Sequence, residues 1–297
     1  MSSRFDAGEV ITAMVTPFNK EGNVDYDKAA DLAEYLLDNG SDSLLVAATT
    51  GECPTLTNEE EVELLSTVKR AVRNDCKVIM SAGSNSTIEA VKYAKMAEKE
   101  GADAILSVVP YYNKPSQEGM KAHFSAIAEA VKIPVIIYNI PSRTGVNMLP
   151  ETVAYLAKKY NNIVGIKQSY PDMDMVSEMK DLCPEDFSIY CGDDSLILPM
   201  LSLGATGVVS VASHIYGEEI KSMIEDFKEG NIKSALNMHM ILYPMFKKLF
   251  MAPNPVPVKA ALSKMGIIKD YVRQPLVILN YEQKAELFAL MDTIEKE

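Results

Sequence analysis

The segment Asn161-Asn-Ile-Val-Gly-Ile-Lys167 has the length, the β-branched residues and the glycine that are typical of a buried strand. A strand that is buried on both faces normally excludes lysine, because desolvating an ammonium group is costly. If this strand belongs to a parallel barrel and Lys167 lies at its carboxyl end, the side chain opens into the place where barrel active sites form. Lys167 is therefore the first candidate for a functional residue.

The chemistry expected of Lys167 follows from its position. Partial desolvation lowers the pKa of a lysine, so that some free amine exists at neutral pH. A free amine attacks a ketone to form a Schiff base. The alternative interpretation is that Lys167 is simply the first solvated residue after a strand, and the chemistry at other strand ends decides between the two.

Strand-like and helix-like patterns alternate along most of the chain. Eight β-then-α units predict a parallel sheet, and eight is the number that closes into a (β/α)8 TIM barrel. A doubly wound open sheet is the alternative, but Thr16-Pro-Phe-Asn after the first strand has no glycine-rich dinucleotide loop. The expected strands cover residues 10–15, 43–48, 77–82, 104–109, 134–139, 162–167, 187–191 and 206–211.

The helical patterns lie between these strands and continue after the last one. They cover residues 25–39, 58–73, 86–100, 117–131, 150–160, 173–182, 194–203 and 217–228, followed by 231–250, 255–266 and 281–296. Helix starts are indicated by Thr57 with Glu60, Ser86 with Glu89, and Pro150 with Glu151. Gly40, Gly101 and Gly204 stand where helix ends favour a left-handed residue. We therefore expect a catalytic barrel over residues 1–229 and a helical C-terminal domain over residues 230–297.

Composition limits the class of protein. The chain has 297 residues, of which 47% are hydrophobic and 24% charged, so it can build a sizeable core. Its 41 acidic and 29 basic residues give a net charge of −12, which argues against nucleic acid as a partner. A small anionic substrate remains compatible with this charge, because it requires only a local arginine or lysine.

The sequence also gives expectations about location and metals. Met1-Ser-Ser-Arg-Phe-Asp lacks the pattern of a signal peptide, and no apolar run reaches the roughly 20 residues of a membrane helix. The four cysteines have no metal-type spacing and the three histidines are scattered, so we expect a cytoplasmic protein with reduced thiols and no metal site.

Three further strand ends carry functional groups. Ala47-Ala-Thr-Thr-Gly-Glu52 offers hydroxyls and backbone N–H groups to a carboxylate, although threonine is also ordinary in turns. Tyr138-Asn-Ile-Pro-Ser-Arg-Thr-Gly145 carries a tyrosine that can pass protons and an arginine that can clamp a carboxylate. Pro110-Tyr-Tyr-Asn-Lys-Pro115 is a stiff loop that presents phenols or, alternatively, an interface patch.

Together these segments and Gly165-Ile-Lys167 resemble the dihydrodipicolinate synthase family, within the class I pyruvate lyase and synthase superfamily. The resemblance covers nearly the whole chain, from Thr16-Pro17 to Asn254-Pro-Val-Pro-Val-Lys259. It implies a lyase that condenses pyruvate with L-aspartate 4-semialdehyde through a Schiff base, in lysine and diaminopimelate biosynthesis, without a cofactor. The sequence departs from the family pattern at Ala48, where glycine is usual, and at Gln168-Ser169, where glutamate and alanine or threonine are usual.

The resemblance also implies roles for individual residues. Lys167 would form the Schiff base, and Arg143 would hold the carboxylate of aspartate semialdehyde. The proton relay would consist of Tyr138, Thr49 and Tyr112, the last reaching in from a neighbouring subunit. Thr50 would bind the pyruvate carboxylate, with Gly192 and Val209 lining the pocket. An allosteric lysine site would use Asn85, Glu89, Tyr111, Asn58 and Glu61. The expected assembly is a homotetramer, a dimer of dimers.

Two other functions remain open on the sequence alone. A sister aldolase acting on a 2-keto sugar acid would share Lys167, Tyr138 and the threonine pair, but it would need hydroxyl-binding groups in place of the Arg143 clamp. A catalytically silent barrel that only binds a ligand is the second alternative. The complete set of nucleophile, relay and clamp favours the synthase over both.

Overall fold

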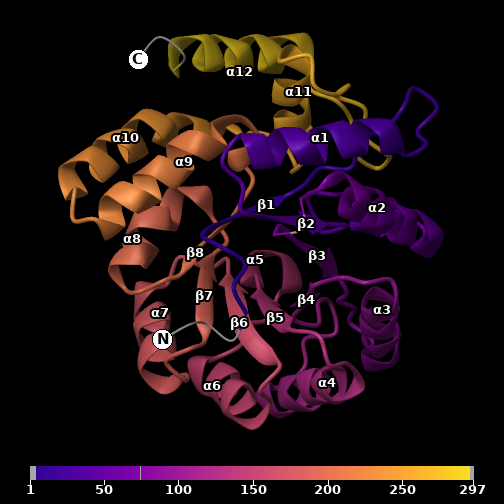
Figure 1. Cartoon of the computed structure of the whole chain (residues 1–297), viewed down its shortest axis with the longest axis vertical. Helices are drawn as coiled ribbons and strands as arrows, with labels where there is room; N and C mark the ends of the chain where they lie inside the picture. Colours follow the sequence, from indigo (N-terminus) through magenta and orange to yellow (C-terminus); the bar gives the residue numbers. More distant parts are fainter. Residues whose placement is uncertain (1–4, 74, 295–297) are drawn as a thin grey trace. The chain divides into compact units, whose positions relative to one another are not determined.

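The strands and helices alternate as the sequence predicts. The computed structural model describes residues 5–73 and 75–294, and its eight strands follow the order β1 to β8 in a closed barrel (Figure 1). Most strand residues are buried, as expected when helices cover a parallel sheet. The strands are β1 Val10–Ala13, β2 Ser43–Val46, β3 Lys77–Ser81, β4 Ala104–Val108, β5 Val135–Asn139, β6 Ile163–Gln168, β7 Ser188–Cys191 and β8 Gly207–Ser210.

The helices agree closely with the predicted ranges. Those between the strands are α1 Tyr26–Asp38, α2 Asn58–Ala71, α3 Thr87–Lys99, α4 Gln117–Ala130, α5 Pro141–Thr144, α6 Pro150–Lys159, α7 Met173–Leu182 and α8 Ile197–Ser202. Those that follow β8 are α9 Ser213–Lys228, α10 Ile232–Lys248, α11 Val256–Lys264 and α12 Tyr281–Ile294. Two short 3-10 helices, η1 Cys53–Thr55 and η2 Asp194–Leu196, complete the described elements. The (β/α)8 barrel with C-terminal helices is confirmed.

The chain forms two compact units, which we describe separately. Among the described residues, unit 1 comprises 5–8 and 77–209, and unit 2 comprises 9–73, 75–76 and 210–294. In unit 1, β5, β6 and β7 are parallel neighbours, and Lys167 is in register with Tyr138 on one side and Tyr190 on the other. Outside the strands of unit 1, α3, α4, α6 and α7 are successive neighbours, with α3 beside β4 and α6 beside β6 (Figure 1).

Unit 2 contains β1 and β2, which pair in parallel, together with α1, α2 and the helices from α9 onward. His214 in α9 is a buried residue of unit 2. Its ring is fully buried, its Nε2 accepts the Val15 N–H at 3.1 Å, and its Nδ1 lies 2.8 Å from the Val211 carbonyl. Burial lowers the pKa of His214 to about 4, so this residue is a neutral packing element.

Helix ends show where the local rules succeed and where they fall short. Thr57 and Glu60 form the predicted capping box at the start of α2. Ser86 precedes α3 as predicted, but its side chain makes no capping hydrogen bond. The sequence interpretation missed α5, and it placed the start of α9 at residue 217, past a non-helical break at Tyr216. The division into domains at residue 229 stays a prediction.

No helix in ranges 5–73 and 75–294 is both long and apolar enough to cross a membrane. Within the same ranges, no group of three or more histidine, cysteine, aspartate or glutamate side chains is arranged to hold a metal ion.

Gly40 gives a test of the packing in unit 2, and Gly101 in unit 1 is its matched control. Gly40 and Gly101 both have left-handed backbones, with φ of +94° and +85°. A Cβ on Gly40 would lie 2.5 Å from the Gly217 backbone, whereas a Cβ on Gly101 would meet nothing within 4 Å. We expect Gly101→Ala to lower the free energy of unfolding by about 1–2 kcal/mol through backbone strain alone.

Gly40→Ala adds this overlap to the same strain, so the expected loss is about 3–5 kcal/mol. Urea unfolding followed by far-ultraviolet circular dichroism measures both variants against the unmodified chain. Equal losses for Gly40→Ala and Gly101→Ala would contradict the close approach of Gly40, which follows α1, to Gly217 of α9.

Candidate active site

Lys167 and Tyr138 are brought together at the carboxyl ends of β6 and β5. They are partners across the two parallel strands, and each side chain is only 7% exposed. The Lys167 Nζ lies 4.5 Å from the centroid of the Tyr138 ring. An amine against the face of a phenol ring is held close to a group that can pass protons. Lys167 and Tyr138, predicted as nucleophile and proton carrier, therefore lie next to each other in unit 1.

Gly192 completes the wall beside Lys167. A Cβ at residue 192 would lie 3.0 Å from the Lys167 Cε and 1.9 Å from the Ser169 Oγ, so glycine alone fits there. The Ser169 hydroxyl donates to the Gly192 carbonyl at 3.2 Å, which fixes the backbone that follows β7. Val209 of β8 is buried, as expected of a residue that lines the barrel interior.

The loops that carry Arg143 and Tyr112 contact each other. Arg143 lies on α5, a single turn that starts at Pro141 and ends at the left-handed Gly145. The Tyr112 N–H donates to the Thr144 carbonyl at 3.3 Å, so the two loops meet one residue from Arg143. Both side chains are exposed, and Tyr112 is 89% exposed at a φ of +71°. A bulky residue rarely adopts this backbone unless its surroundings enforce it.

Thr49 and Thr50 follow β2 in unit 2. Thr50 is only 3% exposed, and its Oγ1 accepts a hydrogen bond from the Asn254 Nδ2 at 2.8 Å. Ala48 has an ordinary backbone, whereas its neighbour Ala47 is left-handed, with a φ of 51°. Alanine in place of the usual glycine at position 48 is therefore accommodated without backbone strain.

Gln168 lies away from Lys167. Successive side chains of a strand face opposite sides, so Gln168 leaves the face on which Lys167 stands. Its Oε1 accepts from the Asn139 Nδ2 at 3.0 Å, and Asn139 also donates to the Asn147 Oδ1 at 2.8 Å. The departure from glutamate therefore alters a hydrogen-bond network behind the strand.

The residues predicted for an allosteric lysine site are divided between the units. In unit 1, the Asn85 carbonyl accepts from the Asn113 Nδ2 at 2.9 Å, Tyr111 is 41% exposed, and Glu89 pairs with Lys92. In unit 2, Asn58 and Glu61 begin α2.

Burial raises the pKa of Glu61 to about 7. Burial also raises the pKa of the Cys53 thiol to about 12, with the Glu61 charge adding to the shift. A bound ammonium would stabilise the ionised form of the buried Glu61 carboxyl, because a nearby opposite charge favours ionisation.

The sequence interpretation assigned no role to a buried charged cluster in unit 2. Lys259 of α11 is fully buried and forms an ion pair with Glu52, itself 2% exposed. The Lys259 Nζ also donates to the Tyr271 carbonyl at 2.9 Å and lies 4.1 Å from the Phe18 ring centroid. Burial lowers the pKa of Lys259 to about 8, although the Glu52 carboxylate raises it.

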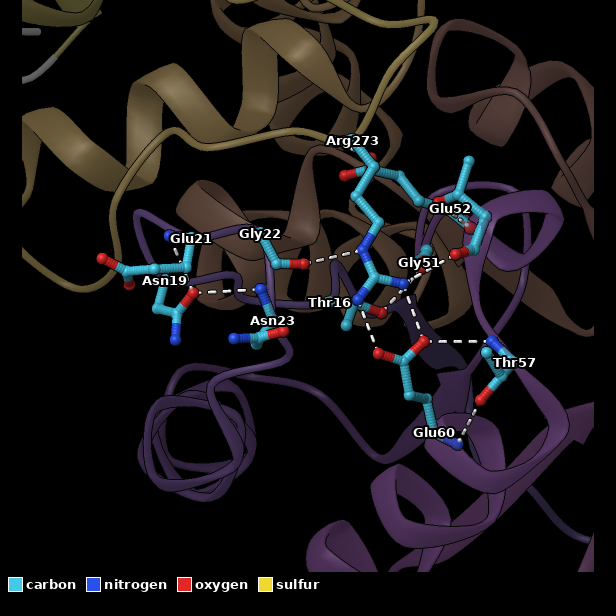
Figure 2. Close-up of polar contacts among 11 residues, drawn as sticks. Thr16, Asn19, Glu21, Gly22, Asn23, Gly51, Glu52, Thr57, Glu60 and Arg273 are labelled. Atoms are coloured by element: carbon cyan, nitrogen blue, oxygen red, sulfur yellow. Dashed lines mark hydrogen bonds and ion pairs between the residues drawn. The ribbon is translucent and has the colours of Figure 1, made fainter.

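Arg273 extends this cluster, as Figure 2 shows. Its backbone N–H donates to Glu52 at 2.9 Å, and its guanidinium donates to the Gly22 carbonyl at 2.8 Å and to Glu60. The one sequence signal for this buried cluster was Lys259, a lysine inside the apolar helical pattern of residues 255–266. Its partner Glu52 lies 207 residues away in the sequence.

Comparisons with known proteins agree with this geometry. Residues 6–294 match the model of the dihydrodipicolinate synthetase family. The chain is 52% identical over 275 residues to the 4-hydroxy-tetrahydrodipicolinate synthase of Desulforamulus reducens, and the match covers 93% of each chain.

Solved structures give the same result. The synthase of Cyanidioschyzon merolae, crystallised with lysine bound, is 46% identical with a TM-score of 0.95, covering 97% of this chain and 98% of that one. The chloride-inhibited synthase of Acinetobacter baumannii, complexed with pyruvate, is 35% identical with a TM-score of 0.94, covering 98% and 99%. On this evidence the chain belongs to the dihydrodipicolinate synthetase family.

Proposed function

We propose that this chain condenses pyruvate with L-aspartate 4-semialdehyde to give 4-hydroxy-tetrahydrodipicolinate, the first committed step of lysine and diaminopimelate biosynthesis. It is an enzyme of the lyase class, in agreement with relatives that are about half identical to it over nearly their full length. The observation that carries the proposal is the buried Lys167 at the carboxyl end of β6, with its amine over the Tyr138 ring.

The reaction begins with a covalent step at Lys167. Its free amine adds to the ketone carbon of pyruvate, a C–N bond forms, and the carbonyl oxygen leaves as water. The resulting iminium accepts the electron pair released when a methyl proton is removed, which gives an enamine. The enamine carbon attacks the aldehyde carbon of aspartate semialdehyde, and the new alkoxide takes up a proton. The amine of the second substrate then attacks the imine carbon, closes the ring and releases Lys167.

Each step moves a proton, so hydroxyl groups are required as carriers. We assign this relay to Tyr138 near the end of β5, and to Thr49 and Tyr112 in the loops after β2 and β4. Thr50 binds the pyruvate carboxylate through its hydroxyl. Arg143 holds the carboxylate of aspartate semialdehyde, because its planar guanidinium matches a carboxylate with two parallel hydrogen bonds. Gly192 and Val209 line the pyruvate pocket.

The assembly we propose is a homotetramer built as a dimer of dimers, located in the cytoplasm. The exposure of Tyr112 and its left-handed backbone support a role outside its own chain, in the relay of a neighbouring subunit. Two-fold pairing then gives two shared sites in each dimer. We also assign a regulatory lysine site to Asn85, Glu89, Tyr111, Asn58 and Glu61, and the raised pKa of Glu61 supports an ammonium ligand there.

The first prediction is that pyruvate and borohydride label Lys167. Reduction of the Schiff base leaves a stable adduct, which peptide mapping by mass spectrometry locates. Lys259 serves as an internal control, because it is buried like Lys167 but is held in an ion pair and should stay unlabelled. Lys167→Ala should lose nearly all activity while keeping its circular dichroism spectrum. Labelling of a different lysine, or of none, contradicts the mechanism.

The second prediction concerns the second substrate. Arg143→Ala should lower kcat/KM for aspartate semialdehyde about 30- to 150-fold, which corresponds to about 2–3 kcal/mol for hydrogen bonds to a charged group. Pyruvate should still form its adduct with Lys167. Arg70→Ala, which removes an exposed arginine bonded only within α2, is the matched control. Unchanged kinetics for the aldehyde would favour a sister aldolase.

The third prediction tests the shared site. Tyr112→Phe and Lys167→Ala subunits should each be nearly inactive alone. A mixed dimer combines the intact lysine of one chain with the intact tyrosine of the other, so it rebuilds one complete site. Mixing the variants under conditions of subunit exchange should therefore restore part of the activity. Mixed dimers that are verified by native mass spectrometry and stay inactive would rule out the shared relay.

A further inference from the structure

Asn254 makes a specific contact with the Thr50 hydroxyl that the proposed chemistry does not yet use. Its Nδ2 donates to the Thr50 Oγ1 at 2.8 Å, across 204 residues of sequence. Asn254 lies between α10 and α11, outside the strands and strand-end loops that supply the other site residues. Its Oδ1 is buried and has no hydrogen-bond partner among the described residues. The hydrogen bond to Thr50 is therefore the interaction that the Asn254 side chain makes here.

The direction of this hydrogen bond matters for the Thr50 hydroxyl. A hydroxyl has one hydrogen to donate and two lone pairs that accept. Because the Asn254 amide donates, it occupies a lone pair of Oγ1 and leaves the hydrogen of Thr50 available for another acceptor. A carboxylate is an acceptor only, and its hydrogen bonds are the stronger, charge-assisted kind. The geometry thus prepares Thr50 to donate to a carboxylate.

The loop that carries Thr50 is held by the same C-terminal segment. Glu52, two residues after Thr50, pairs with Lys259, which lies five residues after Asn254. Glu52 has a left-handed backbone, with a φ of 59°, and its second oxygen accepts the Arg273 N–H at 2.9 Å. Gly51, between Thr50 and Glu52, is held by Thr16, whose hydroxyl donates to the Gly51 carbonyl at 2.7 Å (Figure 2). Thr50 and Asn254 therefore meet on fixed backbones.

We propose that Asn254 is a positioning residue for pyruvate: its amide N–H orients the Thr50 hydroxyl so that Thr50 donates its hydrogen to the pyruvate carboxylate. This inference rests on the proposed function, in which Thr50 binds that carboxylate. It adds a residue from the C-terminal helical segment to the recognition of the first substrate, and it gives the Asn254 side chain a role that depends on hydrogen-bond direction.

The test compares two substitutions of Asn254 in the full-length chain. Because pyruvate is bound covalently before the second substrate reacts, kcat/KM for pyruvate reports the first stage separately. Asn254→Ala frees the Thr50 hydroxyl to rotate, so kcat/KM for pyruvate should fall about tenfold. The value for aspartate semialdehyde should stay within about twofold. Asn231→Ala, which removes an exposed amide bonded to Asp226 and Glu229, is the control and should change neither.

Asn254→Asp separates hydrogen-bond direction from packing. Aspartate has nearly the shape of asparagine, but its carboxylate accepts the hydrogen of Thr50 and repels the carboxylate of pyruvate. The loss in kcat/KM for pyruvate should therefore exceed that of Asn254→Ala, at about a hundredfold. If Asn254→Asp is as active as Asn254→Ala or better, side-chain shape is what matters and the proposal is wrong. This near-isosteric variant also keeps the test valid if Asn254→Ala fails to fold.

A double-mutant cycle with Thr50→Ala decides whether Asn254 acts through Thr50. In the Thr50→Ala background, Asn254→Ala should cause no further loss in kcat/KM for pyruvate. A full additional loss would overturn the positioning role and leave the proposed function intact. If Thr50→Ala alone leaves kcat/KM for pyruvate unchanged, the assignment of Thr50 in the proposed function fails instead. The unmodified chain, the two single variants and the double variant therefore distinguish failure of the positioning role from failure of the proposed function.

Discussion

The ion pair between Lys259 and Glu52 is the constraint on which the loop after β2 depends. Both side chains are almost completely buried, so each would carry a large desolvation cost without the other. A pair of this kind is weak evidence for stability, because an apolar pair of similar volume often does as well. Its specific effect is geometric. It joins a turn near the start of the chain to a helix near its end, and it fixes the backbone beside Thr50.

The surroundings of the two buried lysines, Lys259 and Lys167, differ in a way that suits one to a structural role and the other to a chemical one. Lys259 has a carboxylate, a backbone carbonyl and an aromatic ring as partners, which satisfy an ammonium in place. Lys167 lies over a tyrosine ring, beside a glycine at which any Cβ would crowd the Lys167 side chain. The same side chain thus serves as an anchor in unit 2 and as a candidate nucleophile in unit 1.

Local patterns predicted the elements of this fold, since alternation of buried strands and amphipathic helices is a property of short segments. The capping box at Thr57 and the left-handed Gly40, Gly101 and Gly204 were predicted for the same reason. Pro141–Thr144 was missed because a four-residue helix has no periodicity to detect. The pairing of Glu52 with Lys259 was missed because local hydrophobic periodicity does not indicate which side chains far apart in the sequence come into contact.

Backbone strain is found in the loops after β2 and β4. The non-glycine residues with left-handed backbones in the described chain are Ala47, Glu52, Tyr112 and Lys114, and all lie in the loops after β2 and β4. Each conformation of this kind costs on the order of 1–3 kcal/mol and persists only where the surroundings enforce it.

In unit 2 the enforcing contacts are those of Lys259 and Arg273 with Glu52. In unit 1 they are the hydrogen bonds of the Tyr112 N–H to Thr144 and of Asn113 to Asn85. The loops that carry Thr49 and Tyr112 are therefore strained parts of the described chain, and distant segments hold them in place. This arrangement is what a reaction with many proton transfers requires, because hydroxyl groups that move together must be positioned before the substrate arrives.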